Sequence, residues 1–219
     1  MDKYRARFSK SGRAVYISHL DLLHTLQKAF CRADLKVKHS EGFNPHPYTS
    51  IALPLPLGMS SDCELLDFRL AEEVQPGSIA ARLNPVLPEG IEITDVYEPE
   101  RKPSEIKWIR VTGRLEYDRG ADDGVLDALR SFYAQESIVI SKKTKRGTAQ
   151  FDIIPAFKEL SLAQEEGSVQ LQAVVSAQEP TFNPELFVEA LRQKNAALVP
   201  DFAAFSRVEN YDAEMKIFR

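Results

Sequence analysis

Apolar and polar positions change their spacing several times within the first hundred residues. Residues 4–9 alternate between apolar and polar, which predicts a strand, and apolar residues recur at helical spacing over residues 19–34. Shorter apolar segments predict strands at residues 35–39, 51–55, 64–70 and 91–97, and a short helix at residues 77–83. The resulting order is β-α-β-β-α-β with an elaborated middle. This is the ferredoxin-like arrangement, in which two helices cover one face of an antiparallel sheet.

The same order of elements returns after residues 99–106, where Pro99 and Pro103 stand among charged residues and indicate a linker. The later pattern predicts strands at residues 108–117, 138–141, 149–154, 169–177 and 203–211, a helix at residues 125–133, and a further helix that begins at Asn183-Pro184. We therefore predict an α+β fold made of two tandem ferredoxin-like (βαββαβ) halves with antiparallel sheets, at residues 1–98 and 107–219. One larger α+β domain is the alternative.

Composition places the chain among ordinary folded proteins. Of its 219 residues 43% are hydrophobic and 27% charged, which argues against wholesale disorder. No apolar run approaches the roughly 18 residues needed to span a bilayer, and the N-terminus lacks the apolar stretch of a signal peptide, so we expect a cytoplasmic protein without membrane contact. Cys31 and Cys63 are the only cysteines, and they fit neither a disulfide framework nor a zinc or iron–sulfur motif. We expect no cofactor.

Positive charge is concentrated near the N-terminus. Residues 1–50 contain nine Lys or Arg and four Asp or Glu, although the whole chain has a net charge of −4. Local charge steers polyanions more than the overall charge does, so this asymmetry indicates an end of the molecule that faces an anion. The alternative is a mildly basic segment that pairs internally with the acidic remainder.

The helix predicted at residues 19–34 has a polar face as well as an apolar one. His24, Lys28 and Arg32 follow one another at intervals of four residues, so they form one stripe along the helix. Such a stripe can follow a phosphate backbone and contact RNA. An ordinary solvated helix face is the alternative.

The start of this helix carries a second candidate. Ser18 is a plausible N-cap with Asp21 three residues later, a short-chain variant of the capping box. A helix N-terminus attracts anions, and His19 could transfer a proton there while Asp21 orients it. The spacing alone favours the simpler interpretation, in which Ser18 and Asp21 only cap the helix.

Residues 40–47 form the most unusual segment. Gly42 gives a permissive backbone and two prolines flank His46, so a stiff loop is expected. Phe43 and Tyr48 could stack on bases, while Asn44 and His46 could contact a base edge or a carboxylate. This composition favours recognition. The alternative is a tight turn in which Phe43 fills the core.

In the second half, residues 142–147 hold four positive charges at a predicted hairpin tip, among them Lys142, Lys145 and Arg146. Phosphate binding and a solubilising loop are both compatible with that composition. Asp152 alternates with apolar residues and could face a groove or solvent. The spacing of His19, His24, His39 and His46 matches no zinc motif, so we predict no metal site.

The first half contains several specific motifs, which are Arg5-x-Arg7-Phe8-x-Lys10-x-Gly12, Ser18-His19-Leu20-Asp21, Arg32-Ala33, Ser40-x-Gly42-Phe43-Asn44-Pro45-His46-Pro47 and Leu55-Pro56-Leu57-Gly58 with Ser61 and Glu64. Together they resemble a known bacterial family, the uncharacterised radical SAM-linked proteins. In the second half Lys145-x-Gly147 and Phe151-Asp152-Ile153 are similar to a weaker pattern. There Ile154-Pro155 stands where the family is expected to have Arg-Pro.

The resemblance implies a partner more than an activity. The family is a domain of unknown function found fused to, or encoded beside, a cobalamin-binding radical SAM protein. This chain lacks the three-cysteine motif that would hold a radical SAM cluster. It is more distantly similar, at the level of fold, to CRISPR-type RNA-processing endonucleases.

Two hypotheses follow. In the first, the chain is a non-catalytic accessory module that binds RNA or a translation-related substrate for a radical SAM enzyme. Its binding surface would comprise His19, Asp21, His24, Lys28, Arg32, Phe43, Asn44, His46, Tyr48, Lys142, Lys145 and Arg146. In the second, it is a metal-independent ribonuclease or transferase that uses His19 and His46, which must then converge on one phosphate. A purely structural subunit with an apolar interface is a third interpretation.

Overall fold

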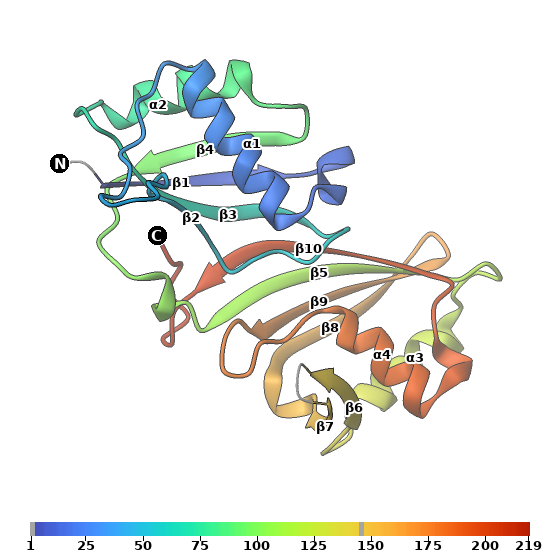
Figure 1. Cartoon of the computed structure of the whole chain (residues 1–219). Helices are drawn as coiled ribbons and strands as arrows, with labels where there is room; N and C mark the ends of the chain where they lie inside the picture. The colour runs from blue at the N-terminus through green and yellow to red at the C-terminus, as the bar shows by residue number, and fades with distance from the viewer. Residues whose placement is uncertain (1–2, 145–146) are drawn as a thin grey trace. The chain divides into compact units, whose positions relative to one another are not determined.

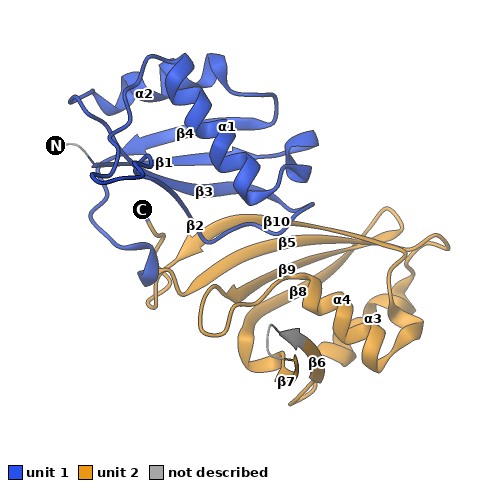
Figure 2. Cartoon of the chain, viewed as in Figure 1, with its two compact units in different colours: residues 1–105, 219 blue, residues 106–218 orange. Residues whose placement is uncertain are grey.

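The computed structural model describes residues 3–144 and 147–219, and helices are interspersed among its strands (Figure 1). The strands pair antiparallel and helices pack against them, so the predicted α+β class with antiparallel pairing is confirmed. The chain divides into a first unit, residues 1–105 with Arg219, and a second unit, residues 106–218 (Figure 2). No helix in the described ranges is long and apolar enough to cross a membrane.

In the first unit the strand order is β4-β1-β3-β2, and α1 and α2 cover one face of the sheet (Figure 1). Its elements are β1 (Lys3–Lys10), the 3-10 helix η1 (Gly12–Tyr16), α1 (His19–Arg32), β2 (Thr49–Ala52), β3 (Ser60–Arg69), α2 (Pro76–Leu83), η2 (Asn84–Val86), β4 (Ile91–Tyr97) and η3 (Pro103–Glu105). The core between helices and sheet includes Tyr4, Ala6, Phe8, Leu22, Leu26, Phe30, Leu66, Phe68 and Ile79.

The alternation in β1 separates the core from the opposite face of the sheet. Tyr4, Ala6 and Phe8 are buried beneath the helices. Because successive side chains of a strand point to opposite faces, Lys3, Arg5 and Arg7 lie on the other one, which we call the open face. Opposite them in the register with β3 are Arg69, Asp67 and Leu65. The open face of the first unit therefore carries a concentration of charged side chains.

The second unit repeats this strand order as β10-β5-β9-β8. Its elements are β5 (Trp108–Glu116), α3 (Asp123–Tyr133), β6 (Val139–Thr144), β7 (Gly147–Asp152), η4 (Ile154–Ala156), β8 (Phe157–Glu165), β9 (Ser168–Ser176), α4 (Glu185–Lys194), η5 (Ala196–Leu198) and β10 (Phe202–Tyr211). β6 and β7 form a separate hairpin. An aromatic cluster fills the core, with the rings of Tyr133, Phe157 and Phe182 around Phe187.

Two predictions about elements are wrong. Residues 35–39 form no continuous strand and contribute only the isolated bridges Val37–Leu70 and His39–Pro47. β8 is missing from the prediction because its sequence lacks regular alternation. Glu159 there has a φ of 54°, and the pairing with β9 shifts between Lys158 and Ser161. A bulge of this kind hides the period of two by which a strand is recognised.

The start of α1 agrees with prediction, and its end comes earlier. Ser18 Oγ accepts a hydrogen bond from the Asp21 backbone N–H at 3.2 Å and donates one to the Asp21 carboxylate at 2.7 Å. The helix ends at Arg32 rather than Asp34 because Asp34 adopts a φ of 53°, outside the helical region.

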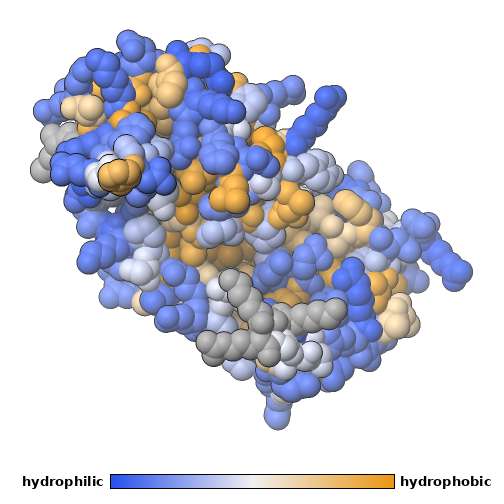
Figure 3. All heavy atoms as spheres, in the orientation of Figure 1, coloured by the Kyte–Doolittle hydropathy of each residue, from blue (hydrophilic) through white to orange (hydrophobic). Residues whose placement is uncertain are grey.

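Hydrophilic side chains dominate the surface visible in Figure 3, interspersed with smaller apolar patches.

Candidate functional site

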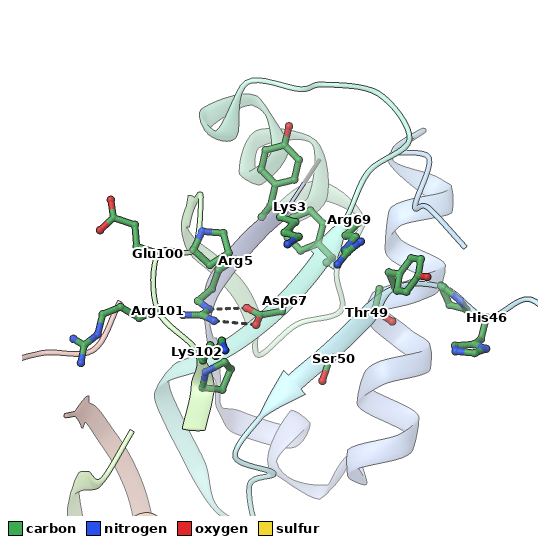
Figure 4. Close-up of a pocket in the computed structure, with 16 residues that line it drawn as sticks. Lys3, Arg5, His46, Thr49, Ser50, Asp67, Arg69, Glu100, Arg101 and Lys102 are labelled. Carbon is green, nitrogen blue, oxygen red and sulfur yellow. Dashed lines mark hydrogen bonds and ion pairs between the residues drawn. The ribbon is translucent and has the colours of Figure 1, made fainter. Parts of the chain in front are cut away.

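A pocket of about 600 Å³ opens on the open face of the first unit (Figure 4). Its walls come from the start of β1, the end of β3, residues 46–50 and residues 99–103. These segments meet because the register of the sheet places Lys3 opposite Arg69 and Arg5 opposite Asp67, with Ser50 on the other side of Asp67. We call this cavity the open-face pocket.

An ion pair forms the floor of the open-face pocket. Arg5 Nε lies 2.6 Å from Asp67 Oδ1, and Arg5 Nη2 lies 2.9 Å from Asp67 Oδ2, a bidentate contact visible in Figure 4. Arg5 is 1% exposed, whereas the Asp67 side chain keeps 32% of its surface exposed. The planar guanidinium fork fixes the carboxylate in one orientation, so Asp67 presents a rigid acceptor to the pocket.

Cations outnumber carboxylates around this floor. The charged residues that line the pocket are Lys3, Arg5, Arg69, Arg101 and Lys102 on the positive side, and Asp67 and Glu100 on the negative side. The Arg69 guanidinium lies 4.9 Å from the centre of the Tyr48 ring, and an aromatic ring attracts a cation without cancelling its charge. Arg101 forms a long ion pair of 3.4 Å with Glu105 and points away from the Arg5–Asp67 pair in Figure 4. The pocket is therefore suited to an anionic ligand.

The loop at residues 40–47 borders this pocket and is closed by its own hydrogen bonds. Ser40 N–H donates to the His46 carbonyl at 2.9 Å, and His46 N–H donates to Ser40 Oγ at 3.1 Å. The His46 ring makes contacts through Nδ1, at 3.1 Å to Ser40 Oγ and 3.3 Å to the Asn44 carbonyl. Gly42 allows the turn with a φ of 128°. Asn44 is exposed. Because both contacts of the His46 ring are made by Nδ1, the other ring nitrogen, Nε2, can contact a ligand.

The two aromatic side chains of the segment are accessible. Phe43 has a relative exposure of 110% and Tyr48 one of 38%. The alternative interpretation, a turn that buries Phe43 in the core, is therefore wrong. A fully exposed phenylalanine on a closed loop has no packing role, so its ring is available to a binding partner.

A second pocket of about 500 Å³ lies between α1 and residues 34–39. His24 and Lys28 line it from the helix, His39 from the opposite segment, and Pro47 lines both this pocket and the open-face pocket. Arg32 does not join them, because its guanidinium donates to the Val86 carbonyl at 3.0 Å. The predicted stripe is thus divided, and only His24 and Lys28 share a concave surface.

His19 and Asp21 lie at the other end of the first unit. Lys10, at the end of β1, is 1% exposed and donates from Nζ to the Ile17 carbonyl at 2.8 Å, which attaches the start of α1 there. Burial lowers the pKa of Lys10, and the neighbouring Glu64 partly counteracts this shift. Asp21 is engaged in the helix cap.

His46 lies beside the start of β1 instead. The Arg69 N–H donates to the Tyr48 carbonyl at 3.1 Å, and Arg69 pairs with Lys3. β1 spans eight residues, which is about 25 Å of strand. The structure therefore places His19 and His46 at opposite ends of the sheet and does not bring them together.

Of the candidates in the second unit, Lys142 donates to the Thr181 carbonyl at 3.3 Å and lies 5.0 Å from the Phe151 ring centre. These contacts hold it against its own unit. Lys145 and Arg146 lie outside the described residues. Asp152 accepts hydrogen bonds from the backbone N–H groups of Ile138 and Ile154, a structural role. Within the described ranges no group of three or more His, Cys, Asp or Glu residues could hold a metal ion.

Sequence reasoning missed most of the open-face pocket. Lys3, Arg5, Asp67, Arg69, Arg101 and Lys102 were not among the candidates. The alternation of basic and apolar residues in β1 was the available signal, since it places Lys3 and Arg5 on one face. Their pairing with β3 depends on the register between segments about sixty residues apart, which the local pattern does not reveal.

A family model described as "Uncharacterized protein conserved in bacteria (DUF2344)" matches residues 3–184. No curated protein matches the sequence.

Two solved structures are similar to the chain at 13% identity. One is a chain in the "Crystal Structure of a Cbf5-Nop10-Gar1 Complex", with 94% of this chain and 48% of that chain covered and a TM-score of 0.47. This chain thus spans about half of its length. The other is an unknown protein from Galdieria sulphuraria, with 94% and 98% covered and a TM-score of 0.27.

Proposed function

We propose, from the premise that the chain belongs to the family of uncharacterized proteins conserved in bacteria (DUF2344), that it is an accessory module that binds RNA for a partner enzyme. The observation that carries this proposal is the excess of cations in the open-face pocket, where Lys3, Arg69 and Lys102 surround a cavity of about 600 Å³. Lysine and arginine side chains that neutralise phosphates supply most of the affinity in nucleic-acid binding.

The aromatic side chains beside the pocket support RNA over a simple inorganic anion. Phe43 is fully exposed and Tyr48 is partly exposed, next to the cations of the pocket. Single-stranded RNA is bound by stacking its bases on aromatic rings while basic residues contact its phosphates. The central strands β1 and β3 present Arg5 and Asp67 rather than aromatic rings on the open face, so stacking is assigned to the loop.

The enzymatic alternative has less support. A ribonuclease or transferase that used His19 and His46 would need both imidazoles within reach of one phosphate. Their places at opposite ends of β1 oppose such a mechanism. His46 with its Nε2 accessible can still bind a phosphate or a base edge as a hydrogen-bonding group.

We propose a cobalamin-binding radical SAM protein as the partner, on the resemblance of the sequence motifs. The chain would then supply binding, and the partner would supply the cluster and the reaction. Cys31 is exposed on α1 and Cys63 is buried on β3, and two thiols are fewer than the four that usually hold an iron–sulfur cluster. We also propose a cytoplasmic location, in keeping with a chain whose two cysteines form no disulfide with each other.

We infer further that the units are tandem ferredoxin-like halves, residues 1–98 and 107–219, joined at residues 99–106. The order β-α-β-β-α-β in the first unit and the repeated strand order, β4-β1-β3-β2 and β10-β5-β9-β8, support this assignment. The hairpin of β6 and β7 is then an insertion after α3.

RNA binding is tested by fluorescence anisotropy with a labelled single-stranded RNA of mixed sequence at two salt concentrations. We expect binding that weakens steeply between about 50 and 200 mM salt, since each phosphate contact releases counterions. The variant Lys102→Glu should weaken binding, while Lys194→Glu, an exposed lysine on α4, should not. Absence of binding, or binding that ignores salt, would contradict the proposal.

The partner is tested separately, by purifying the tagged chain from its native host and identifying the bound proteins. We expect a cobalamin-binding radical SAM protein among them. Recovery of the chain without such a protein, in an extract where that protein is detected, would contradict the partnership and leave RNA binding as a separate question.

A further inference from the structure

The floor of the open-face pocket carries a carboxylate, which is unexpected in a site that binds only phosphate. Asp67 keeps 32% of its side chain exposed there, although Arg5 binds it from one side. A phosphate brought against this carboxylate would meet a like charge in a partly desolvated cavity, which is unfavourable. The group that a ligand places on the floor must therefore be a hydrogen-bond donor.

Asp67 retains the capacity to accept such a donor. A carboxylate offers about four lone-pair positions. The Arg5 fork occupies Asp67 with one hydrogen bond to each oxygen, at 2.6 and 2.9 Å. Ser50 stands directly across from Asp67 in the register of β2 and β3 and is exposed, so its hydroxyl can complete a polar contact beside the carboxylate.

The cations of the pocket lie one step further along the same strands. Lys3 and Arg69 are two residues from Arg5 and Asp67 respectively and pair with each other across the strands. Two residues of strand correspond to about 6.6 Å. The pocket thus has an acceptor floor and a cationic rim, which suits a ligand with an N–H donor at one end and a phosphate at the other.

We propose that the open-face pocket reads an unpaired base that carries an exocyclic amino group, and so prefers cytosine to uracil. Asp67 accepts a hydrogen bond from the amino group, and Lys3 and Arg69 bind the neighbouring phosphate. Carboxylates recognise the cytosine amino group in the same way in other nucleic-acid complexes. The inference rests on the proposed RNA binding and narrows it to single-stranded RNA, because in an RNA duplex the free hydrogen of the amino group lies in a deep, narrow major groove that side chains do not reach.

The test compares a fluorescein-labelled oligocytidylate with an oligouridylate of equal length, by anisotropy with the full chain. These ligands differ at C4, where cytosine has an amino group and uracil a carbonyl oxygen, and at N3, which is an acceptor in cytosine and carries a hydrogen in uracil. We expect oligocytidylate to bind about tenfold more tightly. Equal affinity, or tighter binding of oligouridylate, would overturn the base preference and leave RNA binding intact. No binding of either would overturn RNA binding as well.

A matched pair of variants assigns the preference to Asp67. In Asp67→Asn the side chain keeps its size and can also donate, so the preference for oligocytidylate should disappear. Asp95→Asn is the control, since Asp95 pairs with Arg7 on β1 and does not line the pocket. This variant should still bind oligocytidylate about tenfold more tightly than oligouridylate. Retention of the preference in Asp67→Asn would contradict the assignment.

A change in the ligand covers the case in which Asp67→Asn fails to fold. An oligomer of N4,N4-dimethylcytidine keeps the ring and the phosphates but has no amino hydrogen. With the unaltered protein it should bind as weakly as oligouridylate. Binding as tight as that of oligocytidylate would overturn the proposed hydrogen bond.

Discussion

The two units share a strand order but balance the charges of their sheets differently. In the second unit Arg110 pairs with Glu159 at 3.1 Å, Arg114 pairs with Glu116 at 3.0 Å, and Lys158 lies 4.0 Å from the centre of the Trp108 ring. In the first unit Arg5 is paired with Asp67, whereas Lys3, Arg69 and Lys102 surround a cavity. The same arrangement of strands thus carries two arginines in ion pairs in one unit and a candidate anion site in the other, so the difference between the units lies in their side chains and not in their strand order.

The largest expected effect is on the free energy of unfolding, and it distinguishes the buried ion pair of the first unit from an exposed ion pair of the second. Asp67→Ala would leave the Arg5 guanidinium, 1% exposed, without its bidentate partner. We expect a loss of about 3 kcal/mol in the free energy of unfolding, at the low end for a broken buried pair because Asp67 is partly exposed. Glu159→Ala, in an exposed pair, should cost about 0–1 kcal/mol. Urea denaturation measures both, and equal losses would mean that the two pairs are equivalent.

The next effect concerns RNA binding. Replacing Lys3, Arg69 and Lys102 together by glutamine should weaken the binding of single-stranded RNA roughly a hundredfold and flatten its salt dependence, since about three phosphate contacts are removed. Replacing Arg110, Arg114 and Lys158 by glutamine is the matched change in the second unit and should leave affinity unchanged. Anisotropy titrations at two salt concentrations measure this. A comparable loss of RNA affinity in both triple variants would mean that binding is not specific to the first unit.

A smaller effect is expected at the loop. Phe43→Ala should lower RNA affinity about tenfold by removing one stacking platform. Because the side chain is fully exposed, its removal should not lower the melting temperature. Phe202→Ala, at a ring of the second unit that is 56% exposed, is the control and should alter neither quantity. An unchanged RNA affinity in Phe43→Ala would remove the loop from the binding surface.

The smallest effect is confined to alkaline pH and the second unit. Burial raises the pKa of Tyr117 to about 12, and its hydroxyl donates to the Leu198 carbonyl at 2.9 Å. Because the pKa in the folded state is above the ordinary value of about 10, the stability that this phenol contributes is complete below pH 10. It is lost as the pH rises through about 12. Ultraviolet titration of the phenolate, with Tyr117→Phe as control, should show this late ionisation; an ionisation near pH 10 would contradict it.

The helices and most strands could be predicted because their pattern is local. The apolar spacing of α1 and its Ser18 cap are both present in consecutive residues, and the structure has both. β8 was missed because Glu159 interrupts its alternation. Residues 35–39 were predicted to form a whole strand but form only isolated bridges, because a short apolar run does not show how many of its backbone groups find a hydrogen-bonding partner.

The candidate site was less predictable because it depends on distant contacts. The exposure of Phe43 and the closed loop around His46 agree with the stiff loop expected at residues 40–47. The separation of His19 from His46 depends on the direction in which α1 returns along β1, and a linear sequence does not give it. Residues 99–103 were interpreted as a linker by composition, but they also form a wall of the open-face pocket.

The alternation in β1 has a consequence for how this protein can change over time. The residues that fill the core, Tyr4, Ala6 and Phe8, and those that face the pocket, Lys3 and Arg5, are the two sides of one strand. Deleting or inserting a single residue in β1 would exchange the two sets and destroy stability and binding together. Substitutions of exposed open-face residues such as Lys3 leave Tyr4, Ala6 and Phe8 in place. The charge of the pocket can therefore diverge between relatives through substitution, while the length of β1 stays fixed.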